Sequence, residues 1–125
     1  MSSQFEVELA AVRKIARSKP LSIFHRNATT WEFVLLLAAK DGGTDEGIYN
    51  TLQRLETPYL GHSALLKFLR DRRLEGSITY AEQEKRSKWG LRLAPDVLGE
   101  LKLLQEQRNL QLCTALTQQD QKCRF

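Results

Sequence analysis

The spacing of apolar side chains along the chain predicts five helices and one β-hairpin. At the N-terminus, Phe5, Leu9, Val12 and Ala16 recur at helical intervals with Ile15 beside them, which is typical of an amphipathic helix. The same periodicity places helices at residues 4–18, 31–40, 45–55, 62–73 and 95–113, and the hairpin at 77–93. We therefore expect a mainly α-helical chain with a small β component, an α+β fold.

The helix expected at 31–40 is apolar on nearly all sides, which indicates the buried centre of the fold. Thr30 is a suitable N-cap, Glu32 lies near the positive end of the helix dipole, and Asp41 followed by two glycines ends the helix. We expect the segment before it, 20–29, to connect two helices and to cover the core with its apolar residues.

Two further helices precede the hairpin. Thr44 is expected to cap the helix at 45–55, which has acidic residues in its first turn and buries the apolar residues that follow. A turn at 57–61 leads to the helix at 62–73. The apolar stripe of that helix consists of Leu65, Leu66, Phe68 and Leu69.

The hairpin is predicted from two short runs rich in apolar and β-branched residues, 77–81 and 89–93, which flank a charged tip. Pro95 suits the first position of the last helix. The apolar stripe of that helix consists of Val97, Leu98, Leu101, Leu104 and Leu110. The glutamine-rich tail, 117–125, is expected to fray.

This order of elements is that of a winged helix-turn-helix domain with one additional helix at each end. The 125 residues are the usual size of one domain, so we expect a single domain over 1–125. The winged helix-turn-helix core is expected to span 31–93.

The distribution of charge along the chain favours a surface that binds phosphate. The net charge is +4, and residues 61–92 alone contain eight basic and four acidic residues, a difference of +4. Residues 1–20 carry +2, residues 21–60 carry −2, and the remainder is neutral. A basic patch confined to one third of the chain is typical of nucleic-acid binding, and it is also compatible with a solvated charged face.

The polar residues of the helix at 62–73 lie opposite its apolar stripe. They are His62, Ser63, Lys67 and Arg70. A recognition helix places such residues against base edges in the major groove and against the neighbouring phosphates. Arg72 and Arg73 at the end of the helix are expected to contact phosphates or to cap the C-terminus. An ordinary amphipathic helix with a solvated basic face has the same pattern.

The tip of the hairpin strengthens the DNA-binding hypothesis. A flexible basic loop can enter the minor groove or follow the phosphate backbone. Most charged hairpin tips are solvated turns, but a basic helix followed at this distance by a basic hairpin is more specific than either feature alone. We therefore predict contacts with double-stranded DNA from His62, Ser63, Lys67, Arg70, Arg73, Lys85, Arg86 and Lys88.

These features together resemble the MarR family of bacterial transcriptional regulators. The matching stretches are Trp-Glu-Phe-Val-Leu-Leu-Leu-Ala-Ala at 31–39, residues 63–78, and Glu-Lys-Arg-Ser-Lys-Trp-Gly-Leu-Arg-Leu-Ala-Pro at 84–95. The resemblance covers residues 5–112. The wing of the family carries Asp-x-Arg and then Leu-Thr, whereas this chain has Glu-Lys-Arg and Leu-Ala, with one more residue between them.

The resemblance implies a homodimeric transcriptional regulator, expected to act as a repressor, that binds a palindromic operator. The helices at 4–18 and 95–113 would form the dimer interface, since their apolar faces are longer than one chain of this size covers. The alternative is a protein with the same fold but no role in transcription. It would be a winged-helix adaptor, or a DNA-binding replication or partition factor of a plasmid or phage.

The resemblance also implies a pocket for a small-molecule effector. The candidate lining residues are Phe24, His25, Trp31 and Tyr59. Aromatic residues in such positions more often belong to the core.

Other classes of protein find no support in the sequence. It has no glycine-rich phosphate loop and no cluster of metal ligands or catalytic carboxylates, so we expect no enzymatic activity, metal or cofactor. Cys113 and Cys123 are expected to be reduced thiols, with a redox-sensing or intersubunit disulfide as the alternative. Without a signal peptide or a long apolar run, the expected location is the cytoplasm.

Overall fold

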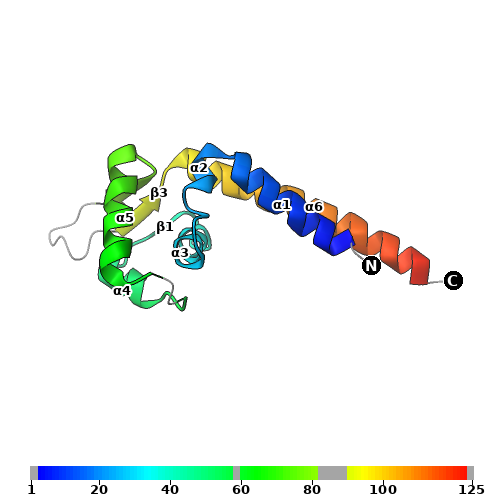
Figure 1. The fold of residues 1–125 in the computed structure, drawn as a ribbon, viewed down its shortest axis with the longest axis horizontal. Helices are drawn as coiled ribbons and strands as arrows, with labels where there is room; N and C mark the ends of the chain where they lie inside the picture. Colours follow the sequence, from blue (N-terminus) through cyan, green and yellow to red (C-terminus); the bar gives the residue numbers. More distant parts are fainter. Residues whose placement is uncertain (1–2, 58–59, 82–89, 124–125) are drawn as a thin grey trace.

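A computed structural model of the chain describes residues 3–57, 60–81 and 90–123 (Figure 1). These residues form helices joined to a small antiparallel sheet, which confirms the expected α+β class. The elements in chain order are α1 (Ser3–Arg17), α2 (Lys19–Ser22), α3 (Ala28–Ala38), β1 (Gly43–Thr44), α4 (Ile48–Gln53), α5 (His62–Glu75), β2 (Ile78–Ala81), β3 (Gly90–Leu93) and α6 (Pro95–Cys123).

The sheet has the strand order β1-β3-β2, and both pairings are antiparallel. The pairing of β2 with β3 runs over all four residues of each strand, so the strands of the expected hairpin are confirmed. Its tip, residues 82–89, lies outside the described part of the chain. The sequence analysis missed β1, which pairs with β3 through Thr44 and Leu91. A two-residue strand has no periodicity of its own to detect.

Helix α3 is the buried centre of the fold, as its sequence predicts. Phe33, Val34 and Leu37 are completely buried, while Leu35 is 45% exposed. Helix α3 packs against β3, and α5 packs against β2. The most deeply buried members of the surrounding cluster are Leu21, Phe24, Leu52, Leu65, Leu69, Ile78, Leu91 and Val97. Burial of such side chains supplies most of the stability of a domain of this size.

The start of α3 differs from the prediction. The N-cap is Asn27, whose side chain accepts a hydrogen bond from the Thr30 amide at 2.9 Å. Thr30 itself lies buried within the first turn, and its hydroxyl donates to the carbonyl of Phe24 at 2.6 Å. The helix ends at Ala38, two residues before the predicted end at 40, and Asp41 and Gly42, which are expected to stop it, both have positive φ values, 57° and 91°.

Helix α4 is shorter than the predicted helix at 45–55. Thr44, the expected N-cap, belongs to β1, and its hydroxyl oxygen accepts from the Glu46 amide at 3.1 Å. The observed N-cap is Gly47. The strand therefore includes the residue that the sequence analysis assigned as the N-cap of the helix.

Helices α1 and α6 form an antiparallel pair, the α1–α6 arm (residues 3–17 and 95–123), which extends away from the core in Figure 1. Glu8 of α1 pairs with Arg108 of α6, and Lys14, which comes later on α1, donates to Gln107, which comes earlier on α6. The two helices therefore run in opposite directions. Helix α6 reaches Cys123, ten residues beyond the predicted end at 113, and includes most of the tail expected to fray. The short helix α2 lies in the expected connection, 20–29, and begins one residue before it.

The face of α1 that packs on α6 is not the predicted apolar stripe. Val7, Ala11 and Ile15 are buried, at 8%, 8% and 5% exposure. The predicted stripe is largely exposed, with Phe5 at 78%, Leu9 at 48% and Val12 at 50%. Helix α1 therefore has two apolar faces, of which α6 covers one.

Candidate nucleic-acid interface

Helix α5 presents one face to the core and the other to solvent. Leu65, Phe68 and Leu69 are buried, and Phe68 packs edge-on against the ring of Phe24 with the ring centres 5.8 Å apart. Gly76 ends the helix in the left-handed conformation at φ 89°, which glycine adopts without strain. The burial of one face fixes which side chains of the other face point outward.

The predicted DNA-contact residues of α5 lie on its outer face. His62, Ser63, Lys67 and Arg70 are all exposed. Within the described residues, neither Lys67 nor Arg70 forms an ion pair, so their charges face solvent without a carboxylate partner. Cations in this state are suited to phosphate oxygens or to guanine acceptors.

The entrance of α5 is open as well as polar. The N-cap is Gly61, which offers no side chain to the free amides of the first turn. A Cβ built on Gly61 would meet no described atom within 4 Å. A polyanionic backbone can therefore approach this end of the helix closely.

Two arginines at the end of α5 have different surroundings. Arg73 is exposed, and its guanidinium lies 4.5 Å from the centre of the Tyr80 ring on β2. Arg72 is 6% exposed, lies over the ring of Phe68 at 4.8 Å, and pairs with Glu75 at 2.8 Å. The expectation that Arg72 contacts phosphate or caps the helix is therefore wrong, because its position on the buried side of α5 turns its charge inward.

In the described part of the hairpin, residues 77–81 and 90–93, the one basic residue is Arg92. Lys85, Arg86 and Lys88 lie outside the described residues, so their predicted contacts stay predictions. Arg92 on β3 pairs with Asp45, the residue directly after β1, at 2.5 Å, and it donates to the carbonyl of Thr44 on β1 at 2.7 Å. Its charge thus stabilises the sheet and does not add to an open basic surface.

The connection between α4 and α5 is attached to α3 by the Glu32 carboxylate. Glu32 accepts hydrogen bonds from the amides of Glu56 and Thr57 and from the Thr57 hydroxyl. Partial burial raises the pKa of Glu32, but these hydrogen bonds to the charged form outweigh burial and leave that pKa below its ordinary value of 4.5. The sequence analysis placed Glu32 near the positive end of the dipole of its own helix. It missed the contact of Glu32 with Glu56 and Thr57, which lie 24 and 25 positions further along the chain.

Three of the four predicted effector-pocket residues lie in the described part of the chain, and they have different surroundings there. Phe24 is completely buried in the core, and His25 is exposed and packs edge-on against Trp31 at 4.7 Å. Tyr59 lies outside the described residues. Trp31 alone lines a cavity of about 660 Å³ between α1, α3 and α6, whose other apolar walls include Val12 and Leu35.

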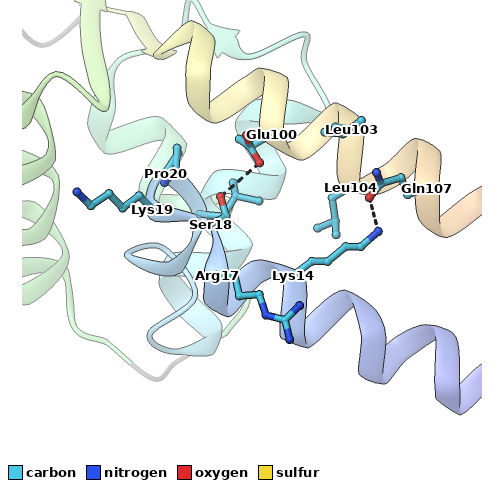
Figure 2. Close-up of a pocket in the computed structure, with 10 residues that line it drawn as sticks. Lys14, Arg17, Ser18, Lys19, Pro20, Glu100, Leu103, Leu104 and Gln107 are labelled. Atoms are coloured by element: carbon cyan, nitrogen blue, oxygen red, sulfur yellow. Dashed lines mark hydrogen bonds between the residues drawn. The ribbon is translucent and has the colours of Figure 1, made fainter.

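A second cavity, of about 370 Å³, lies where α1 bends into α2 beside α6 (Figure 2). Figure 2 shows Lys14 of α1 reaching Gln107 of α6, and Ser18 facing Glu100 at 3.5 Å. The lining includes the three cations Lys14, Arg17 and Lys19 against the single carboxylate of Glu100. Of the predicted lining residues, only Trp31 borders either of these two cavities. The small-molecule effector and its pocket stay predictions.

Other features of the described residues concern metals, thiols and membranes. No group of three or more histidine, cysteine or acidic residues in this part of the chain lies close enough together to hold a metal ion. Cys113 is exposed on α6, and the side chain of Cys123 lies outside the described part. Among the described helices, none is both long and apolar enough to span a membrane.

Comparison of the chain with protein-family models, curated protein sequences and solved structures gives no significant match.

Proposed function

We propose that this protein is a sequence-specific DNA-binding transcriptional regulator of the winged helix-turn-helix class, similar to MarR regulators. In this proposal it acts in the cytoplasm as a repressor and binds a palindromic operator as a homodimer. The observation that carries the proposal is the outer face of α5, where Ser63, Lys67 and Arg70 are exposed at helical spacing. On the opposite face of the same helix, Leu65, Phe68 and Leu69 are buried in the core.

The arrangement of elements around α5 supports the winged helix-turn-helix assignment. Helix α3 is followed by β1, α4, α5 and the β2–β3 pair, which is the element order of such domains. Helix α5 would enter the major groove, with its first turn against the base edges. The connection from β2 to β3 would lie beside the duplex, and it contains Lys85, Arg86 and Lys88.

The surface of the α1–α6 arm supports the homodimer. Phe5, Leu9 and Val12 form an exposed apolar ridge on α1, and α6 exposes Leu103 at 48% and Leu110 at 70%. Exposed apolar side chains of this size, gathered on one arm, are typical of an interaction site. The cavity between α1, α3 and α6 includes Val12 of this ridge in its lining and has both apolar and charged walls, so it can receive an amphipathic helix from a second copy. Two-fold symmetry would then place two α5 helices about 34 Å apart, one turn of DNA.

Selection from random duplex DNA with the purified full-length protein tests the proposal. We expect enrichment of a short inverted repeat. Enrichment without symmetry would favour a replication or partition factor, and failure to bind any duplex at low salt would favour an adaptor.

A matched pair of variants tests the surface. Lys67→Ala is expected to weaken binding and to lower the salt dependence by about one released counterion for each protomer of the dimer. Lys19→Ala, which removes an equally exposed cation from α2, is expected to leave the affinity nearly unchanged. Equal effects of the two variants would show that α5 is not the binding surface.

A further inference from the structure

We infer that Glu32 and Thr29 on α3 are positioning residues that hold the α4–α5 connection and so fix the direction in which α5 meets its DNA site. This inference rests on the proposed DNA-binding function and deepens it, because it assigns part of the sequence specificity to residues that do not touch DNA.

The first half of this contact is made by Glu32. Its Oε1 and Oε2 atoms lie 3.0 Å and 2.9 Å from the amide nitrogen of Glu56, and Oε1 lies 2.9 Å from the amide nitrogen of Thr57. The Thr57 hydroxyl donates to Oε1 at 2.7 Å. The carboxylate therefore takes two consecutive main-chain donors and one side-chain donor from a segment distant in sequence.

The second half is made by Thr29, one turn earlier on the same face of α3. Thr29 is 1% exposed, and its hydroxyl donates to the Thr57 carbonyl at 3.1 Å. The same oxygen accepts from the amide of Leu60 at 3.2 Å. Leu60 immediately precedes Gly61, the N-cap of α5. Only Gly61 therefore separates this contact from His62, the first residue of the helix that carries the candidate DNA-contact face.

The chemistry of the site explains why a carboxylate is needed. All three groups that approach Glu32 are donors, and an ionised carboxylate is the side chain that only accepts. Within the described residues Glu32 forms no ion pair, so its charge serves these hydrogen bonds and not a salt bridge. Hydrogen bonds to a charged acceptor are stronger than those between neutral groups.

The position of the contact gives it consequences for specificity. Base readout requires side chains to be held to within about 0.5 Å of their productive geometry. His62 and Ser63 begin α5, directly after the segment that Glu32 and Thr29 hold. Loss of the contact would let the entrance of α5 shift, which would disturb base contacts more than contacts with the uniform phosphate backbone.

Two sets of variants test the inference. Glu32→Gln replaces one accepting oxygen by a donating amide, and Thr29→Val removes a hydroxyl without changing the shape of the side chain. Thr29→Ser keeps the hydroxyl and serves as the rescue. Glu46→Gln, on an exposed ion pair with Arg54, serves as the charge control.

The first readout is amide hydrogen exchange of the full-length protein without DNA, followed by nuclear magnetic resonance. We expect the amides of Glu56 and Thr57 to exchange about tenfold faster in Glu32→Gln, and that of Leu60 to do so in Thr29→Val. The exchange of core amides in α3 should rise only by as much as the loss of global stability accounts for, and less than that of the released amides, which separates local release from global unfolding. Unchanged exchange at all three amides would overturn the inference.

The second readout is the ratio of affinity for the selected operator to affinity for a shuffled duplex at the same salt concentration. We expect this ratio to fall about tenfold in Glu32→Gln and Thr29→Val, with the salt dependence unchanged, and to be retained in Thr29→Ser and Glu46→Gln. If the wild type binds its operator but the ratio is unchanged in both variants, the inference is wrong while the proposed function stands. If the wild type binds no duplex, the proposed function fails, and the role in specificity fails with it.

Discussion

The core and the α1–α6 arm bury their apolar side chains to different extents. In the core, Phe33, Val34 and Leu37 on one helix are completely buried by elements of the same chain. In the arm, α6 covers one side of α1, and the opposite side leaves Phe5 78% exposed. The comparison teaches that the core is buried by the described residues of one chain, whereas the arm leaves an apolar face of α1 exposed, and this is the face at which the proposed dimer would form.

The largest expected effect is in the core. Phe33→Ala removes a completely buried ring, and the lost transfer energy together with the cavity should lower the free energy of unfolding by about 3–5 kcal/mol. Urea denaturation followed by circular dichroism measures this change. Leu74→Ala, on a side chain that is 80% exposed on α5, is the control and should cost less than about 0.5 kcal/mol. Similar costs for the two variants would break the distinction between core and surface.

In the arm we expect an effect on association instead of folding. Phe5→Ala removes a side chain that would become buried only in the proposed dimer, which corresponds to about 1.5–3 kcal/mol for each of the two copies, so the dimer dissociation constant should rise at least about tenfold to hundredfold. Sedimentation equilibrium measures that constant. The neighbouring Glu6→Ala should leave it nearly unchanged. A wild type that stays monomeric at all concentrations would contradict the role given to the arm.

A smaller effect concerns the Glu32 carboxylate on the core helix α3. Because the folded-state pKa of Glu32 is lowered, the stabilisation from its ionised form is present above the ordinary pKa of 4.5 and is lost as the pH falls through the folded-state value. Glu32→Gln should therefore be less stable than the wild type by about 1 kcal/mol at neutral pH. Urea denaturation at a series of pH values should show the difference shrinking below 4.5. A difference that grows on acidification would contradict this assignment.

The smallest effect is expected for the exposed ion pair of the arm. Glu8 and Arg108 are each close to half exposed, so Glu8→Gln should cost only about 0.2–1 kcal/mol. The cost should disappear at high salt, because screening weakens exposed charge pairs. Thermal unfolding at low and high salt provides the measurement. A loss as large as that of Phe33→Ala would show that the arm depends on this pair, and would reverse the comparison with the core.

The candidate interface was predictable where it depended on local pattern. The helix expected at 62–73 is observed at His62–Glu75, because apolar residues at helical spacing determine both its existence and its inner face. The same spacing places Ser63, Lys67 and Arg70 outside. The same spacing also places Arg72 on the inner face, four residues after Phe68 and three after Leu69, so its burial could have been predicted and the sequence analysis missed it because the residue is charged.

The sequence alone determined the order of the main elements, the central position of α3 and the two strands of the hairpin. These features depend on side chains within a few positions of one another, whose periodicity is visible in the sequence.

Only the tertiary structure decided which face of α1 is covered, why Thr44 belongs to a strand, and how Glu32 holds Thr57. Each of these depends on partners far away in sequence: α6 for α1, β3 for Thr44, and the α4–α5 connection for Glu32. Burial and hydrogen bonding between distant segments are properties of the packed chain, so local periodicity does not encode them.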